Sequence, residues 1–302
     1  MVTKSSRITL SRSLALASML VIQTVTTARA GFVTFDMGGT SAPSSIQSTV
    51  DSFRTALGGA NNGNSPGPLA NGRREINWDG GGATTAALSK STLSTFTNTR
   101  GSTFTTTGSG FLQTPLSDPA LTDINPNYST TFSAFSLQRV FTPVGSNITD
   151  ITFFVPGSNG ATAATVGGFG AVFSDVDLPN VTHLEFFDSS NVEILNLDVT
   201  PGTTTNSSLS FLGAVANDGE RIARVRITTG NSALGPNDSN GYPTDVVVMD
   251  DFIYSEPMAI TVPEPTSLAL AGTAMLGLVS VLIVRRRTAR FAEVNGFRES
   301  QQ

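Results

Sequence analysis

The chain has 302 residues, a formal net charge of −5 at pH 7, no cysteine and a single histidine, His183. These counts exclude disulfides, a thiolate nucleophile, a sulfur-based zinc site and a metal cage built on several histidines. Charged residues make up 14% of the chain, well below the usual share of about 25%, which argues against a coiled coil or a charge-driven disordered chain. The length allows about two average domains, although one β-sandwich can occupy most of it.

Residues 1–30 have the organisation of a secretory signal peptide. Three basic residues precede a short apolar run at 14–22, and the small residues Ala28 and Ala30 come just before Gly31. This order predicts export with cleavage after Ala30. An uncleaved membrane helix is the alternative, but the apolar run is too short to cross about 30 Å of hydrocarbon comfortably.

Residues 31–110 are rich in Gly, Asn, Ser and Thr, and several turn signals fall within 60–68. We expect a loop-rich N-terminal part of the exported domain that wraps the rest of it. Short strands are predicted at 75–78 and 102–106, where Thr, Trp, Phe and Ile lie between glycines.

Residues 111–257 carry a much clearer β pattern. Eight segments rich in β-branched and aromatic residues are separated by Gly, Pro and Asn at intervals of roughly 8 to 12 residues. They are 132–141, 148–155, 168–173, 183–187, 192–199, 208–213, 222–227 and 245–253. The pattern predicts an all-β fold, an antiparallel β-sandwich of jelly-roll type. No amphipathic helix of useful length is expected before the C-terminal apolar segment.

The C-terminal end has three parts. A linker, 258–266, contains Pro-Glu-Pro, residues 267–284 carry no charge, and a basic tail, 285–302, opens with three arginines. Eighteen residues in a helix extend about 27 Å, near the minimum that spans a bilayer. The arginines would stay in the cytoplasm. We therefore predict a transmembrane helix with the preceding domain outside, in agreement with the signal peptide.

Pro-Glu-Pro, an apolar helix and an arginine cluster in this order resemble the PEP-CTERM sorting signal of bacteria that make exopolysaccharide. The residues that carry the resemblance are Pro263, Glu264, Pro265, Arg285, Arg286 and Arg287. In that family a membrane exosortase reads the signal and is thought to cut near the tripeptide. The resemblance implies an exosortase, the secretion machinery and the membrane as partners, with exopolysaccharide as a further candidate. Fifteen residues, 288–302, follow the arginines, whereas the family's signal usually stops close behind them.

The exported segment, 31–262, is strongly acidic. It holds nine Lys or Arg against twenty Asp or Glu, a net charge of −11. Such a domain repels nucleic acid and anionic lipid, so we expect no nucleic-acid partner, and it favours solubility or cation binding.

A second resemblance covers about residues 70–257. The segments that carry it are Ile76-Asn77-Trp78-Asp79, 145–156, 168–178, 219–227 and 246–252. They are similar to a recurrent uncharacterised ectodomain of exported bacterial proteins, some of which have the same tail. This resemblance implies a jelly-roll fold and no established activity.

Five aspartates form the sharpest polar pattern: Asp175, Asp177, Asp188, Asp250 and Asp251. Asp175 and Asp177 stand at i and i+2 at a predicted strand end, where hard oxygen ligands and a backbone carbonyl can hold Ca²⁺. Ca²⁺ is therefore a candidate ligand, although a full site needs about six to eight oxygens. The alternative is that these acids face solvent at turns or hold backbone donors.

No catalytic residue is predicted. Twenty acids make some carboxylate pair unavoidable in any fold, and His183 lies in a predicted strand without a Gly-x-Ser-x-Gly elbow. Gly80 to Gly82 do not lie between a strand and a helix, as a phosphate loop would. Trp78, Tyr128 and Tyr242 are the amphipathic aromatics in loop or edge positions on which a sugar could stack, but Trp78 suits the core equally well.

Taken together, the sequence predicts an exported protein, membrane-anchored before processing and then on the cell surface or outside the cell. It would be a surface or extracellular-matrix component without its own catalysis. The alternative is a carbohydrate-binding or carbohydrate-active ectodomain with loops stabilised by Ca²⁺.

Overall fold

The structure is a computed structural model that describes residues 31–80, 86–88, 91–236 and 243–260. The predicted signal peptide, the Pro-Glu-Pro signal and the apolar segment 267–284 lie outside these residues. Within the described ranges, no helix is long and apolar enough to cross a membrane.

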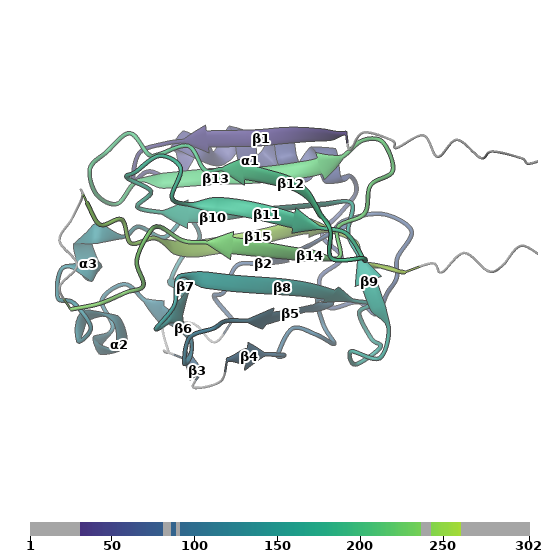
Figure 1. Ribbon diagram of the computed structural model, residues 1–302, viewed down its shortest axis with the longest axis horizontal. Helices are drawn as coiled ribbons and strands as arrows, with labels where there is room; N and C mark the ends of the chain where they lie inside the picture. The colour runs from purple at the N-terminus through teal and green to yellow at the C-terminus, as the bar shows by residue number, and fades with distance from the viewer. Residues whose placement is uncertain (1–30, 81–85, 89–90, 237–242, 261–302) are drawn as a thin grey trace, which may run out of the picture.

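Two antiparallel sheets pack face to face, and a helix covers the outer face of one of them (Figure 1). Sheet 1 runs β1 (Phe32–Gly38), β13 (Leu209–Ala216), β10 (Gly168–Ser174), β15 (Val248–Ser255), β7 (Arg139–Val144), β6 (Gly110–Pro115) and β3 (Ala86–Leu88), and β2 (Arg73–Ile76) also pairs with β15. Sheet 2 runs β12 (Glu193–Asp198), β11 (His183–Phe187), β14 (Arg224–Thr228), β8 (Ile148–Phe154), β5 (Ser102–Thr105) and β4 (Thr92–Leu93), with β9 (Ala163–Thr165) between β8 and β16 (Met258–Ala259). The predicted antiparallel β-sandwich is confirmed.

The core between the sheets is centred on aromatic rings. Trp78 is 1% exposed and stacks on Phe141 at 3.7 Å between ring centroids, while Phe104 and Phe252 meet its edges. Each well-placed aromatic pair adds about 0.5–1.5 kcal/mol beyond the burial of its area. The ring cluster therefore fixes Trp78 inside the sandwich.

Helix α1 (Ser44–Leu57) corrects the expectation that no amphipathic helix precedes the C-terminal segment. Ile46, Val50 and Phe53 recur at helical spacing and are fully buried against sheet 1, each contributing about 1.5–3 kcal/mol. Glycine in the sheet allows this close approach, because a Cβ on Gly213 would lie 2.8 Å from the Phe53 ring. The other positions are mostly Ser, Thr and Gln, which hides the apolar stripe in the sequence.

Two short helices, α2 (Pro119–Thr122) and α3 (Tyr128–Thr131), cover sheet 1 at one end of the sandwich (Figure 1). Seven of the eight strands predicted from 111–257 are present with small shifts of their ends. Only the second part of 132–141 is strand, because the chain passes from α3 through a loop before β7 begins.

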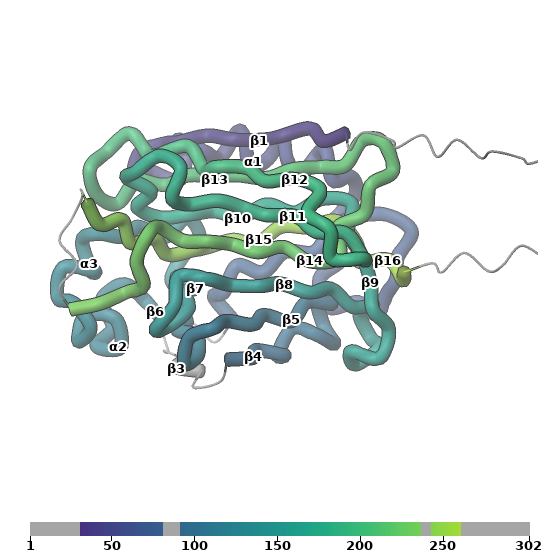
Figure 2. Tube along the Cα trace, in the orientation of Figure 1, coloured from purple at the N-terminus to yellow at the C-terminus, as the bar shows by residue number. Residues whose placement is uncertain are grey.

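The N-terminal part, 31–110, is more regular than expected. The strands predicted at 75–78 and 102–106 appear as β2 and β5, but β1 and α1 occupy much of the predicted loop. β1 pairs with β13 along its whole length, and β2 pairs with β15. This part therefore belongs to the same sandwich. The start of β1 and strand β16 lie at the same end of it (Figure 2).

Candidate functional site

A β-bulge in β15 brings Asp250 and Asp251 to one place. The pairing of β15 with β10 passes from Met249 opposite Phe173 to Phe252 opposite Ala171, so two residues of β15 face one of β10. Neighbouring residues in a regular strand point to opposite faces, and a bulge re-aims a side chain. Both carboxyl groups consequently reach the same hydroxyl group.

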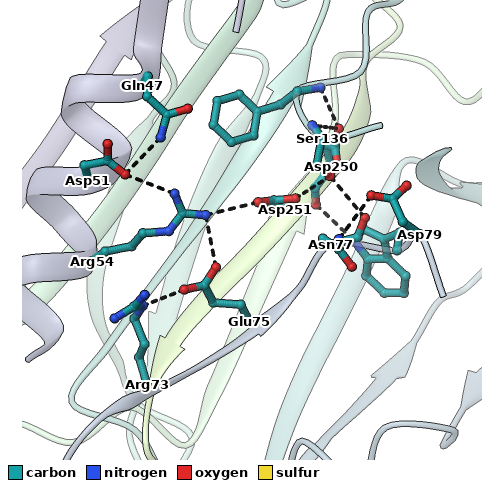
Figure 3. A network of polar contacts seen from close by, with 12 residues as sticks. Gln47, Asp51, Arg54, Arg73, Glu75, Asn77, Asp79, Ser136, Asp250 and Asp251 are labelled. Carbon is teal, nitrogen blue, oxygen red and sulfur yellow. Dashed lines mark hydrogen bonds and ion pairs between the residues drawn. The ribbon is translucent and has the colours of Figure 1, made fainter. Parts of the chain in front are cut away.

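That hydroxyl belongs to Ser136, in the loop before β7. Its Oγ lies 3.1 Å from Oδ1 of Asp250 and 2.8 Å from Oδ1 of Asp251 (Figure 3). The other oxygen of Asp250 accepts the backbone N–H groups of Phe135 and Ser136 at 2.7 and 3.1 Å. One hydroxyl proton can make a well-aligned hydrogen bond to only one of these two oxygens, so a proton on one carboxyl group would complete this cluster.

An ion-pair network continues from Asp251 to helix α1 and strand β2 (Figure 3). Arg54 donates from Nη2 to Asp251 at 3.3 Å and to Glu75 at 3.0 Å, and from Nη1 to Asp51 at 3.1 Å. Arg73 donates from Nε to the second oxygen of Glu75 at 2.5 Å. Both oxygens of Glu75 are therefore neutralised by arginine.

Burial sets the protonation of the pair. It raises the pKa of Asp250 well above its ordinary value, and the charge of Asp251 raises it further, while the hydrogen bonds from Phe135 and Ser136 oppose the shift. Burial also raises the pKa of Asp251, against the opposing effects of Ser136 and Arg54. The two residues are closed to solvent, at 0% and 3% exposed, so burial favours a protonated Asp250 in this polar centre inside the fold.

The other three predicted metal ligands lie elsewhere, and the carboxylates of Asp175 and Asp188 hold backbone donors. Asp175 follows β10 directly, and its Oδ1 accepts the N–H of Ser207 at 2.9 Å. Asp188, at the turn from β11 to β12, accepts the N–H groups of Ser190 and Val192 at 2.8 and 2.9 Å. Asp177 itself donates its N–H to Asp245 at 3.4 Å.

The structure thus does not gather the five aspartates around one point. Among the described residues, no three His, Asp or Glu side chains form a group that could hold a metal ion. The contacts of Asp175 and Asp188 match the alternative that the sequence left open, an acid that holds backbone donors at a turn.

The structure corrects the expectation that Trp78 and Tyr128 could serve as surface aromatics for sugar stacking, because both are buried. Trp78 and Tyr128 are 1% and 0% exposed and belong to the core. Their polar atoms are satisfied inside the fold, where the indole N–H donates to the Asp250 carbonyl at 2.9 Å and the phenol donates to the Gly235 carbonyl at 3.1 Å. Neither ring offers a surface platform, and Tyr242 lies outside the described residues. His183 begins β11, opposite Thr228 of β14.

A cavity of about 550 Å³ lies beside β2, between residues 75–80 and the segment 93–100. Its lining includes Glu75, Trp78, Leu93, Phe96, Arg100 and Gln113. Trp78 and Leu93 are buried, whereas Asn64, Asn77 and Thr95, which also line the cavity, are exposed. The cavity therefore has an apolar floor and a polar mouth, and its volume falls in the range of small-molecule sites, about 300–1,000 Å³.

Arg100 is the unusual side chain of this cavity. Its Nε and Nη1 are shielded from solvent and have no hydrogen-bond partner. Desolvation lowers the pKa of Arg100, and the nearby charge of Arg74 lowers it further. Two buried donors of a cation are consequently left without an acceptor.

Sequence reasoning identified Asp250 and Asp251 but missed Arg54, Ser136 and Arg100. No local motif marks these three residues. The available signal was compositional, since basic residues are scarce in the exported segment and five of its nine, Arg54, Arg73, Arg74, Lys90 and Arg100, precede residue 110.

Comparison with known proteins bears on the C-terminal end. Residues 261–287 match the PEP-CTERM protein-sorting motif, which confirms the resemblance seen at Pro263 to Pro265 and Arg285 to Arg287. The motif marks an exported protein that an exosortase recognises, with its C-terminus held in the membrane before processing. No curated protein and no solved structure matches the chain.

Proposed function

We propose that this protein is delivered by the exosortase system to the cell surface or extracellular matrix and serves there as a component without its own catalysis. The PEP-CTERM motif at 261–287 carries the proposal. It begins directly after Ile260, two residues beyond the start of β16. The folded domain thus stands immediately before the processing signal, as a cargo domain would.

The support for a non-catalytic role comes from the carboxyl pair. General acid–base groups must reach a substrate within hydrogen-bond distance. Asp250 and Asp251 are instead closed to solvent and engaged with Ser136, the backbone and Arg54. Their arrangement is that of a structural centre joining β15, α1 and the loop before β7.

Mass spectrometry of the protein recovered from cells with an active exosortase tests the proposal. We expect a mature C-terminus near Pro263 and loss of the tail. A Glu264→Ala variant is expected to keep its C-terminus at Gln302 and to stay in the membrane fraction. Glu293→Ala makes the same chemical change outside the motif and is expected to be processed normally. An intact Gln302 in the unaltered protein would contradict the proposal.

A further inference from the structure

We propose that the turn between β13 and β14 is a binding site for the α-ammonium group of Gly31, which removal of the signal peptide after Ala30 creates. Glu220 supplies the carboxylate that holds this group. The site concerns the opposite end of the chain from the sorting motif, so the proposal stands whether or not the tail is cut.

The turn already holds both backbone groups of Gly31. The N–H of Gly31 donates to Oε1 of Glu220 at 2.7 Å, and its carbonyl oxygen accepts the N–H of Asn217 at 3.0 Å. The contact with Glu220 joins residues 189 positions apart in the sequence. The first residue of the exported segment is therefore fixed by the turn that follows β13.

Glu220 has no cationic partner among the described residues. Its second oxygen accepts the N–H of Asp218 at 3.2 Å, and the neighbouring Arg221 donates from Nε to Thr165 at 3.0 Å instead. The hydrogen bond from Gly31 is the main cause that lowers the pKa of Glu220, so the carboxylate is charged at neutral pH. A peptide N–H satisfies one of its oxygens but leaves its charge without a counter-charge.

Further polar groups stand beside the same glycine. An added Cβ on Gly31 would overlap Oδ1 of Asn217 and would lie 3.2 Å from Cβ of Asp218. Hydrolysis of the Ala30–Gly31 bond gives a carboxylate on Ala30 and an amine on Gly31, and this amine is mostly protonated at neutral pH. An ammonium group offers three hydrogens and a positive charge, whereas a peptide nitrogen offers one hydrogen and no charge. The acidic turn therefore matches the cleaved N-terminus better than the uncleaved chain.

Binding of the ammonium group would secure the end of an edge strand. β1 is the last strand of sheet 1 and pairs along its length with β13 alone among the described strands. Strand ends with few contacts open easily. The ion pair would tie the first residue of the mature chain to the turn that leads from sheet 1 to sheet 2, at the end of the sandwich where β1 starts (Figure 2).

The amine content of the chain makes a specific test possible. The sequence has two lysines, Lys4 and Lys90, so removal of residues 1–30 leaves two primary amines, those of Gly31 and Lys90. The full protein, recovered from cells that export it, would be labelled near neutral pH with trace acetic anhydride, which reacts with unprotonated amines, and analysed by mass spectrometry. We expect the mature chain to begin at Gly31. Relative to Lys90, Gly31 should be labelled about two- to fivefold faster in Glu220→Gln than in the unaltered protein, the range of an exposed ion pair.

Two further variants support this comparison. Asp123→Asn removes an exposed carboxylate at the end of α2 and is expected to leave the labelling of Gly31 unchanged. Glu220→Asp keeps the charge on a shorter side chain and should be labelled at an intermediate rate, which tests the site should Glu220→Gln not fold. The difference between Glu220→Gln and the unaltered protein should shrink in about 1 M salt, which screens exposed charges, and vanish in concentrated urea. A mature N-terminus other than Gly31, equal labelling of the two proteins, or a difference that persists in urea would overturn the proposal.

Discussion

Protonation of Asp250 makes a contribution to folding that one substitution can isolate. Burial and the charge of Asp251 raise the pKa of Asp250 in the native state, whereas an aspartate in the unfolded chain has a pKa of about 3.9. Above about pH 4 the native state therefore binds more protons than the unfolded state. The free energy of unfolding falls as the pH rises from there, and the stabilisation present at low pH is lost as the pH passes the native pKa.

The size of this effect follows from one proton. A difference of one bound proton changes the free energy of unfolding by about 1.4 kcal/mol per pH unit. Asp250→Asn removes the titrating proton and keeps an oxygen for the N–H groups of Phe135 and Ser136, which Oδ2 of Asp250 accepts at 2.7 and 3.1 Å. Its amide can donate to the Ser136 hydroxyl. The stability of the variant relative to the unaltered protein should therefore rise by about 1.4 kcal/mol per pH unit above about pH 4 and level off above the native pKa.

Urea unfolding followed by Trp78 fluorescence between pH 4 and pH 8 measures the difference, because the indole N–H is bonded to the Asp250 carbonyl at 2.9 Å. Ser136→Ala provides a second test. Its hydroxyl opposes the raised pKa of both carboxyl groups, so its loss should carry the pH dependence to higher pH. If the unfolding free energies of Asp250→Asn and the unaltered protein stay parallel over this range, the protonated centre is refuted.

Two further substitutions test the packing around the site by urea unfolding. Glu256→Gln removes the negative charge beside the buried Arg74 and one of its two 2.7 Å acceptors, which is expected to cost about 3–5 kcal/mol. Asp51→Asn, in an exposed pair, is expected to cost about 1 kcal/mol or less, and equal costs would argue against the buried pair. Gly213→Ala places a Cβ 2.8 Å from the Phe53 ring and is expected to cost about 1–3 kcal/mol. Phe53→Leu should relieve part of this cost in the double variant, and strictly additive effects would contradict the contact.

The strands of sheet 2 were predictable because one of their faces meets solvent. In β14, Val225 and Ile227 are buried while Arg224 and Arg226 point outward, and this alternation is a direct readout of a half-buried strand. Sheet 1 hides its strands better, because helices cover its outer face. Five of the six residues of β6 are buried, so no period-2 pattern remains to be read.

Helix α1 could not be predicted from the sequence for a different reason. Its apolar stripe has few members, and the propensities of its Ser and Thr residues are unremarkable for a helix. The stripe acquires its stability from sheet 1, where Phe53 packs on Phe211 at 5.3 Å and over glycine backbone. Those partners lie more than 150 positions away along the chain. Tertiary contacts of this separation leave no trace in local sequence patterns.

Contacts between residues far apart in the sequence also explain why the candidate site could be predicted only in part. Asp250 and Asp251 stand out in the sequence, but their shared contact with Ser136 depends on a register shift between β10 and β15. A pair of acids near a strand is typical both of a metal site and of a hydrogen-bonded structural pair. The burial of Asp250 and Asp251 and their contact with Arg54 distinguish the second arrangement from the first.

The N-terminal part does more than wrap the sandwich. Its strand β2 completes sheet 1 against β15, and its arginines neutralise carboxylates of the C-terminal strands, Arg54 with Asp251 and Arg74 with Glu256. The exported segment 31–262 has a net charge of −11, and most of the positive charge of residues 31–110 is paired with carboxylates inside the sandwich.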